Sequence, residues 1–500
     1  MNNRKICVSV CAETAGELIA QIKRAENSAD IIEIRFDCLN QTEINSALQQ
    51  LEKINCRKSV LATFRPKEEG GKRQLTLHER INFFEKFLLK NKGKDFFVDF
   101  EIDLHLKLNF ELKNKIVSTH DFSGIPDNLD IIFNLLTTNA NFLKIAAFAD
   151  DISDSIPIWK LIERAKSENR HIIPIAMGEA GKWTRILGLA HGAFMTYAAL
   201  DDGQETAPGQ VSAQDLIKVY RAKQLNEQTE IYGIVGGNTS YSMSPFMQNT
   251  AFKYHHLNAV FVPLQVQNLD EFIRRMVREE TREIELNFKG FAVTIPHKQA
   301  IIKHLDFCDE TAKTIGAVNT VKIVDGKLHG FNTDAHGFIT PLLNTFGDVR
   351  KAKVAVFGAG GAARACLFAL KQAGAEVTIF ARNVKKAKNL AAEFKVELRT
   401  TNYELQGFDI IINATPLGTK GELENETIAT SEQIESVKLI YDLVYNPFQT
   451  KLMSEADKVH VPKIGGMAML VAQGMKQFEI WTGKDAPMKE MSQAVLRRLD

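Results

Sequence analysis

The chain has 500 residues, more than a single hydrophobic core usually supports, so two or three domains are expected. Its hydrophobic content (45%) and charged content (25%) are those of an ordinary globular protein, and its formal net charge is +1. This balance gives no electrostatic case for a nucleic-acid or membrane partner, and no apolar run is long enough to cross a bilayer.

The six cysteines are scattered and form no Cys-x-x-Cys pair, so the sequence indicates neither a zinc site nor a disulfide framework. Reduced, mostly buried thiols of a cytoplasmic protein are expected instead. The chain passes almost directly from its start into a strand pattern, which leaves no room for a signal or transit peptide and favours the cytoplasm.

The first part of the chain alternates short β-rich runs with amphipathic helical patterns. Eight strands are expected, at residues 6–12, 31–37, 58–65, 96–103, 115–122, 142–149, 171–178 and 192–200. Eight strands alternating with helices predict an α/β fold with a closed parallel (β/α)8 barrel, and the alternative is an open doubly wound sheet.

Ionisable residues occupy the expected strands and their carboxyl ends, where barrel enzymes place their sites. Glu33, Arg35 and Asp37 alternate along one strand and should share a face, either as a buried ion-pair network or around a ligand. Lys144 lies in an apolar strand, where burial favours the neutral amine that attacks a ketone, although a buried lysine can also be purely salt-bridged. The remaining candidates follow other strands: Arg65, Glu69, His120 and Arg185.

A second signature lies far downstream. Residues 358–363 read GAGGAA, which fits G-x-G-x-x-A between a strand pattern and a helix pattern and predicts a dinucleotide phosphate site. A tight turn without a ligand is the alternative. The next strand ends at Arg382 without the acid that binds a ribose 2′-hydroxyl, and with Lys385 and Lys386 this favours NADP over NAD. These basic residues could also form only a solvated helix start.

Polar residues between these two regions sit at turn-like positions. They are Ser242, Ser244, Thr294, Lys298, Asn319, Asn332 and Asp334, followed by NATPLG at 413–418, DLVYNP at 442–447 and MLVAQG at 469–474. Each of them taken alone fits turn chemistry.

Residues 1 to about 220 resemble a type I 3-dehydroquinate dehydratase, through EIRFD, TFRPKEEGG, STHDF, FLKIA, MGEAGKWTRI and TAPGQ. The resemblance implies that Lys144 forms an imine with the substrate ketone, that His120 moves protons, and that Glu69 orients His120. It also implies substrate-binding roles, with no metal or cofactor, for Glu33, Arg35, Arg65, Arg185, Thr206 and Gln210. Thr206 stands where the family usually has serine, so the hydroxyl is retained.

Residues 229–500 resemble shikimate dehydrogenase, because the motifs named above occur in the family's order and spacing. The resemblance implies that Lys298 and Asp334 are the acid/base pair. Substrate binding is implied for Ser242, Ser244, Thr294, Asn319 and Gln473. NADP binding is implied for Gly358, Gly360, Gly361, Ala362, Ala363, Arg382, Lys386, Thr415, Tyr445 and Gly466. The sequence departs from the family at Tyr241, Gln248 and Ala292, none of which is an acid/base residue.

Together the two resemblances predict one bifunctional enzyme that dehydrates 3-dehydroquinate to 3-dehydroshikimate and reduces the product to shikimate with NADPH. The expected domains are a barrel over 1–225, a substrate domain over 229–330, an NADP-binding Rossmann-like domain over 331–455, and C-terminal helices over 456–500 that pack back on the substrate domain. One alternative is a catabolic quinate dehydrogenase fused to a dehydratase. Another is a non-catalytic metabolite sensor, which should have lost residues such as Lys144 and Lys298.

Overall fold

The computed structural model describes residues 4–54, 56–108, 112–137, 140–400 and 404–499. The chain forms two compact units. The first comprises residues 1–231, 238–240 and 258–287, and the second comprises residues 232–237, 241–257 and 288–500. The nine-stranded sheet lies in the first unit and the parallel six-stranded sheet lies in the second.

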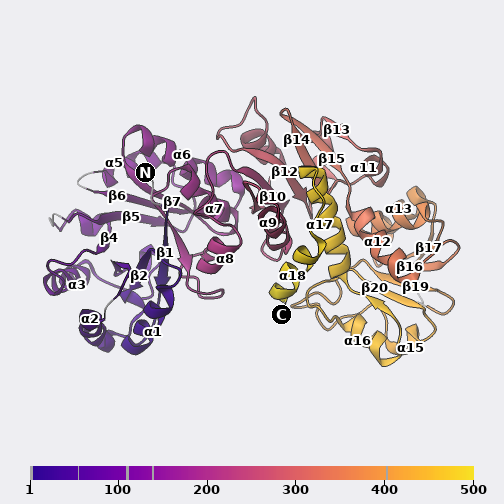
Figure 1. The fold of residues 1–500 in the computed structure, drawn as a ribbon, viewed down its shortest axis with the longest axis horizontal. Coiled ribbons are helices and arrows are strands. Elements are labelled where there is room, and N and C mark those ends of the chain that lie inside the picture. Colours follow the sequence, from indigo (N-terminus) through magenta and orange to yellow (C-terminus); the bar gives the residue numbers. More distant parts are fainter. Residues whose placement is uncertain (1–3, 55, 109–111, 138–139, 401–403, 500) are drawn as a thin grey trace. The chain divides into compact units, whose positions relative to one another are not determined.

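The first unit is built on a curled, nine-stranded parallel sheet, drawn in indigo and purple in Figure 1. Its strands follow the order β7-β6-β5-β4-β3-β2-β1-β8-β9. Their bounds are β1 (Lys5–Val10), β2 (Ile31–Arg35), β3 (Ser59–Thr63), β4 (Phe97–Glu101), β5 (Lys115–Asp121), β6 (Phe142–Phe148), β7 (His171–Met177), β8 (Met195–Ala199) and β9 (Val211–Ser212).

The eight predicted strands are confirmed, and their order is that of an eight-stranded barrel. Strand β1 pairs in parallel with both β2 and β8, with Cys7 opposite Ile31 on one side and Tyr197 on the other. Between β7 and β8, no hydrogen-bonded ladder forms within the described residues; a backbone bond from Phe194 N to Ile172 O bridges them. The sheet is therefore curled, and its hydrogen-bond ladder is open at this seam.

Helices connect the strands of the first unit. They are α1 (Ala15–Ala25), α2 (Ile44–Lys53), α3 (Leu77–Lys90), α4 (Ile102–His105), α5 (Leu129–Leu136), α6 (Ile156–Ser167), α7 (Lys182–His191) and α8 (Ala213–Lys218). Helix α3 begins with a capping box, in which Thr76 and Glu79 satisfy each other's backbone N–H groups.

Apolar side chains from the strands fill the interior of the curled sheet. Cys7, Ile31, Leu61, Phe97 and Ile116 belong to one buried cluster. Polar residues of the first site lie two or four positions further along such strands, on the same face, as Glu33 and Arg35 do after Ile31. The packed cluster thus forms a floor beneath a polar cavity.

Two further six-stranded sheets follow. One runs in the order β11 (Ala259–Gln265), β10 (Glu230–Gly236), β12 (Phe288–Val293), β14 (Thr320–Val324), β15 (Lys327–Phe331) and β13 (Phe307–Cys308). The other is parallel and runs in the order β18 (Glu397–Arg399), β17 (Glu376–Phe380), β16 (Lys353–Phe357), β19 (Ile410–Asn413), β20 (Leu439–Asp442) and β21 (Lys463–Ile464). The last sheet has the predicted Rossmann-like character.

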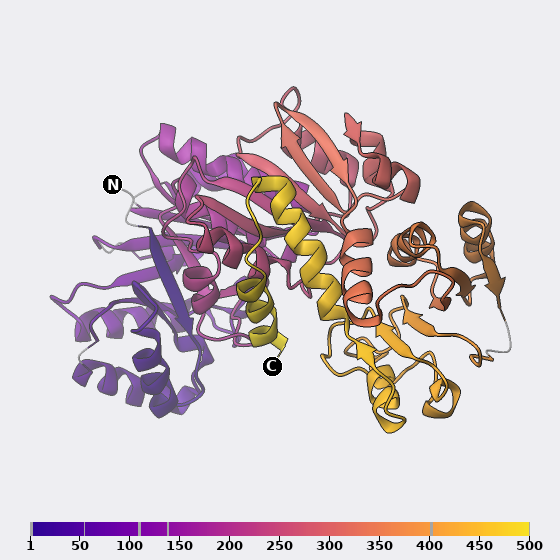
Figure 2. The ribbon, with the colours of Figure 1, turned by 45° about the vertical axis from the view of Figure 1, so that its right-hand side comes forward.

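Helices of the second unit include α9 (Ser244–Tyr254), α12 (Asp334–Phe346), α13 (Gly361–Gln372), α14 (Val384–Phe394), α16 (Lys451–Lys458), α17 (Gly466–Thr482) and α18 (Met488–Leu499). The yellow α17 lies along α12 in both views (Figures 1 and 2). Gly337 permits this approach, since a Cβ there would lie 2.5 Å from the Cβ of Gln473. Helix α17 also donates from Gln477 to Asn319 O and from Trp481 to Val321 O.

Shorter helices complete the structure. In the first unit they are η1 (Phe36–Cys38), η2 (Gln41–Glu43), η3 (Lys67–Glu69), η4 (Ile152–Ser155), η5 (Glu179–Gly181), α10 (Leu269–Phe272) and η6 (Ile273–Val277). In the second unit they are η7 (Ala300–His304), α11 (Glu310–Ile315) and α15 (Ser431–Ile434). Within the described residues, no helix is long and apolar enough to cross a membrane.

Candidate active sites

One cavity in the first unit gathers all nine residues that the sequence predicted for the first site. Its lining includes Glu33, Arg35, Arg65, Glu69, His120, Lys144, Arg185, Thr206 and Gln210. They come from β2, β5, β6, α7 and the segments that follow β3 and β8. The geometry therefore brings together residues that are up to 177 positions apart in the chain (Glu33 to Gln210, 210 − 33 = 177).

His120 and Glu69 form a close pair at one side of this cavity. Nδ1 of His120 lies 2.9 Å from Oε2 of Glu69, and the backbone N–H of His120 donates to the same oxygen at 2.7 Å. Burial, reinforced by the charge of Arg65, holds the pKa of His120 well below its ordinary range. His120 is thus neutral, and Glu69 fixes the Nδ1–H tautomer, which leaves Nε2 as the free base.

Arg35 is held from behind by Asp37. Its Nε and one terminal nitrogen donate to the two carboxylate oxygens of Asp37 at 2.9 and 2.8 Å, and both residues are buried. The expectation that Asp37 shares a strand with Glu33 and Arg35 is wrong, because β2 ends at Arg35 and Asp37 lies in η1. Asp37 supports Arg35 and also accepts from the backbone N–H of Lys72 at 3.0 Å.

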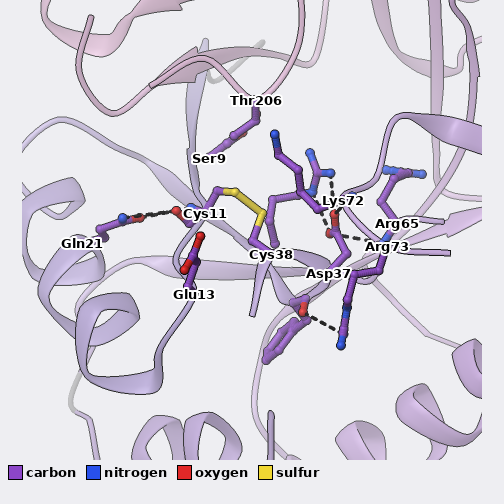
Figure 3. The surroundings of a disulfide bond; sticks show 12 residues. Ser9, Cys11, Glu13, Gln21, Asp37, Cys38, Arg65, Lys72, Arg73 and Thr206 are labelled. Atoms are coloured by element: carbon purple, nitrogen blue, oxygen red, sulfur yellow. Dashed lines mark hydrogen bonds and ion pairs between the residues drawn. A yellow bond between two sulfur atoms is a disulfide. The ribbon is translucent and has the colours of Figure 1, made fainter. Parts of the chain in front are cut away.

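The segment that carries Asp37 is fixed by a disulfide between Cys11 and Cys38 (Figure 3). The bond joins the segments that follow β1 and β2, with Cα atoms 5.4 Å apart. This corrects the expectation that no disulfide is present. Spacing in the sequence could not reveal the pair, because parallel neighbouring strands bring their ends together regardless of the 27 residues between them. The other four cysteines, Cys7, Cys56, Cys308 and Cys366, are free.

The other predicted substrate-binding residues offer hydrogen-bonding groups at the cavity wall. Glu33 accepts from Ser9 and Thr63 at 2.5 and 2.9 Å, which fixes its carboxylate. Thr206 and Gln210 bond to each other, with Gln210 Nε2 3.1 Å from Thr206 Oγ1.

Arg185 has less support than the other arginine side chains of the cavity. Its guanidinium donates to Pro208 O at 3.1 Å, and its Nε has no partner among the described residues. Burial lowers its pKa to about 10, so it still carries its charge at neutral pH. A buried guanidinium with unused donors is suited to bind a carboxylate.

Lys144 touches two groups that the sequence motifs did not indicate. Its Nζ lies 3.0 Å from Oδ2 of Asp99 and 4.2 Å from the centre of the Tyr197 ring. The apolar environment expected for Lys144 is therefore incomplete, and the lysine is salt-bridged in this structure. The sequence pattern could have indicated Asp99, because Asp99 and Glu101 alternate along β4 in the same way as Glu33 and Arg35 alternate along β2.

The second unit brings Lys298 and Asp334 together as the sequence predicted. Nζ of Lys298 lies 2.5 Å from Oδ2 of Asp334, and Asn319 Nδ2 donates to Oδ1 of the same carboxylate at 2.8 Å. Asp334 is the first residue of α12, where its backbone N–H donates to the side chain of Asn332 at 3.0 Å. This local turn aims the carboxylate at the lysine.

Direct contacts join only some of the other predicted substrate-binding residues of this site. Oε1 of Gln473, from α17, lies 3.5 Å from Nδ2 of Asn319. Oγ of Ser242 accepts from the backbone N–H of Ser244 at 3.2 Å, at the start of α9. Thr294 follows β12, and its backbone N–H donates to Val235 O at 2.9 Å.

A cavity of about 1130 Å³ lies where the glycine turn meets the carboxyl ends of the parallel sheet. Eight of the ten predicted NADP-binding residues line it: Gly358, Gly360, Gly361, Ala362, Arg382, Lys386, Thr415 and Tyr445. The turn needs glycine at Gly358, whose φ is +124° and whose Cβ would lie 2.6 Å from Ala414 O. The site therefore fits a dinucleotide, with a helix N-terminus for its phosphates and exposed Arg382 for a 2′-phosphate.

Two predicted cofactor residues do not line this cavity. Ala363 is fully buried in the core beneath α13, because the helix turns its side chain toward the sheet. Gly466 starts α17 and packs against the backbone of Leu443, where a Cβ would lie 2.3 Å from the carbonyl oxygen. Their predicted cofactor roles stay predictions.

The cavity is also lined by residues for which the sequence predicted no cofactor role. Tyr241 and Ile295 are exposed apolar residues on its wall, and Lys420 and Asn383 add polar groups. Beneath it, Asp442 accepts from Asn413 at 2.9 Å and from Thr450 at 2.6 Å. Burial raises the pKa of Asp442 to about 6.

Comparisons with known proteins cover most of the chain. A family model described as type I 3-dehydroquinase matches residues 6–227. A shikimate dehydrogenase substrate binding domain matches residues 234–321, and shikimate/quinate 5-dehydrogenase matches residues 342–451. A shikimate 5′-dehydrogenase C-terminal domain matches residues 466–496.

Individual relatives agree with these matches. The chloroplastic bifunctional 3-dehydroquinate dehydratase/shikimate dehydrogenase of Arabidopsis thaliana is 33% identical over 97% of this chain and 83% of its own length. The shikimate dehydrogenase (NADP(+)) of Methanocaldococcus jannaschii is 39% identical over 55% of this chain and 99% of its own. A crystal structure of a shikimate dehydrogenase in complex with NADP+ matches with a TM-score of 0.51 and 38% identity, over 55% of this chain and 98% of the other.

The fold and the two cavities define a class of protein, a two-site α/β enzyme with a buried lysine in one site and a dinucleotide cavity beside the other. The comparisons then identify the family: the chain belongs to the bifunctional 3-dehydroquinate dehydratases/shikimate dehydrogenases. It is a lyase and an NADP-dependent oxidoreductase in one polypeptide.

Proposed function

We propose that the first cavity dehydrates 3-dehydroquinate through an imine on Lys144. The pair of His120 and Glu69 carries the proton chemistry. His120 removes the proton beside the imine and returns a proton to the departing hydroxyl, while Glu69 holds its tautomer. Arg35, Arg65, Arg185, Glu33, Thr206 and Gln210 bind the carboxylate and hydroxyls of the substrate. The 2.9 Å contact between His120 and Glu69 in a cavity with Lys144 supports these roles.

The second site reduces 3-dehydroshikimate to shikimate, and NADPH bound in the adjoining cavity would supply the hydride. Lys298 and Asp334 act at the reacting oxygen, where the lysine donates a proton and the carboxylate holds it in place. Ser242, Ser244, Thr294, Asn319 and Gln473 bind the substrate, and the glycine turn with Arg382 binds the dinucleotide phosphates. The 2.5 Å contact between Lys298 and Asp334 is the observation that carries this assignment.

One assay tests both activities. The purified chain is mixed with 3-dehydroquinate and NADPH, and cofactor oxidation is followed. We expect oxidation only when both are present, and accumulation of shikimate. A metabolite sensor would oxidise no cofactor, and a catabolic enzyme would reduce NADP+ faster with quinate than with shikimate.

We further propose four parts of the chain, at residues 1–225, 229–330, 331–455 and 456–500, and a cytoplasmic location. The limits of the family matches support the division. The four free cysteines support a reducing compartment, whereas the Cys11–Cys38 bond counts against one. Thiol labelling of the protein taken rapidly from cells tests the location, and it shows whether Cys11 and Cys38 are paired there.

Arg382→Ala should raise the KM for NADPH about tenfold to a hundredfold and barely change the KM for NADH. Arg382 lines the cavity at the end of β17, and losing a charge-assisted contact to the 2′-phosphate costs about 1.5–3 kcal/mol. Steady-state kinetics with both cofactors measures this. Lys388→Ala is the matched control, because Lys388 is exposed on α14 but does not line the cavity. Equal weakening of both cofactors would show that Arg382 does not bind the phosphate.

The dehydratase rate should rise as pH increases through about 7. Burial raises the pKa of Glu69 to about 7, in spite of the opposing charge of Arg65. The carboxylate form of Glu69 accepts from Nδ1–H of His120 more strongly than the protonated form does, so His120 is best oriented above this pH. Glu69→Gln should remove the rise and leave a lower, flatter profile of kcat/KM. A rise near pH 7 that persists in Glu69→Gln would assign it to another group.

A further inference from the structure

The nitrogen of Lys144 sits between two groups that favour a positive charge. On β4, the carboxylate of Asp99 lies 3.0 Å away, and on β8 the ring of Tyr197 has its centre 4.2 Å away. All three residues are at least 95% buried, so little water screens these interactions. A carboxylate and an aromatic face at these distances both stabilise a cation.

Asp99 is itself held rigidly. Its Oδ1 accepts from Ser118 Oγ at 2.5 Å, and its Oδ2 accepts from Arg65 at 2.6 Å as well as from Lys144. Although burial acts in the opposite direction, the charges of Arg65 and Lys144 hold the pKa of Asp99 well below its ordinary range. Asp99 is therefore a fixed negative charge in the floor of the cavity.

We propose that Asp99 is a positioning residue of the dehydratase that holds the Lys144 nitrogen in place and keeps it cationic, both in the resting enzyme and in the substrate imine. The proposal rests on the imine role assigned to Lys144 above. Neither the sequence motifs nor the family matches single out Asp99.

The balance of the imine step shows why a fixed negative charge fits there. The ammonium and the ketone become an iminium and water. A C=N bond replaces the C=O bond, and two N–H hydrogens leave with the oxygen. The nitrogen is positive before and after the step, and only the attacking amine between them is neutral. The carboxylate of Asp99 can thus pair with the same nitrogen throughout.

The positive charge on the imine drives the following step. Removal of the adjacent proton by His120 leaves an electron pair that the iminium accepts and that a neutral imine accepts poorly. By favouring the protonated imine, Asp99 maintains this electron sink up to higher pH. Tyr197 adds to the effect through its ring and remains a neutral phenol, because burial raises its pKa.

Other charged groups face the same nitrogen and must be considered in any pH profile. The cavity lining contributes Glu33, Arg35, Arg65, Glu69, His120 and Arg185. The thiol of Cys7 on β1 also interacts with Lys144, but burial raises its pKa and keeps it neutral. Among these groups, Asp99 is the carboxylate in direct contact with Lys144 within the described residues.

Asp99→Asn tests the proposal through the pH profile of the dehydratase. A direct carboxylate neighbour typically shifts the pKa of a cation by about one to three units. We expect the alkaline fall of kcat to move to lower pH by about that amount, together with slower borohydride trapping at Lys144. The intact bifunctional chain is used, and its dehydrogenase activity and circular dichroism report folding.

Glu101→Gln is the matched control. Glu101 lies two residues further along β4, is equally buried, and pairs with Arg65 at 2.7 Å and Arg80 at 2.8 Å. Glu101→Gln should lower dehydratase activity, because Arg65 loses a partner, but it should not move the pH at which kcat falls on the alkaline side. An unmoved limb in Asp99→Asn, or an equal shift in both variants, would overturn the proposal.

Ser118→Ala covers the case in which Asp99→Asn does not fold. It removes the hydroxyl that donates to Oδ1 of Asp99 and should give a smaller shift in the same direction, while no shift counts against the proposal. The wild-type adduct is mapped first. An adduct at a lysine other than Lys144 refutes the proposed imine, which is a different failure from an unmoved pH limb.

Discussion

Replacing Lys144 by alanine should lower the dehydratase rate by roughly ten-thousand-fold or more, since loss of a covalent nucleophile removes the whole pathway through the imine. Dehydrogenase activity should stay close to wild type, because Lys144 lies in the first unit and the Lys298–Asp334 pair lies in the second. Separate assays with 3-dehydroquinate and with 3-dehydroshikimate plus NADPH measure the two rates.

Chemical trapping gives an independent measure of the same residue. Borohydride added with 3-dehydroquinate should reduce the imine and leave a stable adduct on Lys144, which peptide mass spectrometry locates. Lys86→Ala is the control variant, because Lys86 is exposed on α3 and should change neither the rate nor the adduct. An active enzyme without an adduct, or with one on another lysine, would contradict the imine.

Folding of the variant needs its own check, since Lys144 is part of a buried ion network. Removing it leaves Asp99 paired with Arg65 at 2.6 Å and with Ser118, so the carboxylate is not left without partners. The loss of activity should therefore come from lost chemistry. Thermal unfolding of wild type and variant compared in the same buffer distinguishes the two causes.

The first site was predictable from the sequence because its residues follow strands. Glu33, Arg35, His120 and Lys144 each lie in or at the end of a short apolar run, and parallel strands in a curled sheet bring these ends together. All nine predicted residues consequently share one cavity. The periodicity also placed the strands within a few residues of their observed ends.

The side chains that pair with these residues were harder to predict, because they lie on other strands and the pairing depends on distances across the sheet. Asp99 was taken as part of a strand pattern, although an acid in such a strand needs a buried partner, and here it has Arg65 and Lys144. Asp37 was predicted to lie in the strand with Arg35, but β2 ends at Arg35 and Asp37 lies in η1. The Cys11–Cys38 bond depends on the adjacency of β1 and β2, which no cysteine spacing encodes.

The second site shows a similar division. The glycine turn and Arg382 were predictable from local pattern, because a strand–turn–helix unit fixes their positions within a few residues of one another. Ala363 does not line the cavity, because its side chain points into the core, and Gly466 packs against the backbone of Leu443; their cofactor roles stay predictions. Tyr241 and Ile295 reach the cavity from a different part of the second unit, so only the structure could reveal them.

Lys298→Ala should lower the dehydrogenase kcat by about a hundred- to ten-thousand-fold, the range typical of general acid–base groups. The lysine is 2.5 Å from Asp334, and the same carboxylate accepts from Asn319 at 2.8 Å, so the network fixes a proton donor at one point. The KM for NADPH should change little, because the predicted phosphate contacts lie in the glycine turn and at Arg382. Steady-state kinetics in both directions measures these constants.

Asp334→Asn and Lys313→Ala complete this test. Asp334→Asn keeps the size of the side chain and removes its charge, so it should also lower kcat while binding of NADPH persists. Lys313 pairs with Glu310 on the surface of α11, and Lys313→Ala should leave both activities unchanged. If Lys298→Ala loses less than about threefold in kcat, the proton donor is another group.

The two lysine variants also test the assignment of the sites against each other. Lys144→Ala should retain the reduction step and Lys298→Ala should retain the dehydration step, so neither alone should convert 3-dehydroquinate to shikimate at a useful rate. Mixing the two purified variants should restore the conversion, because each supplies the step that the other lacks and the intermediate is a small molecule that can leave and enter. Chromatographic detection of shikimate gives the result. A mixture as inactive as its components would mean that at least one lysine serves both steps, and the division of chemistry between Lys144 and Lys298 would then be wrong.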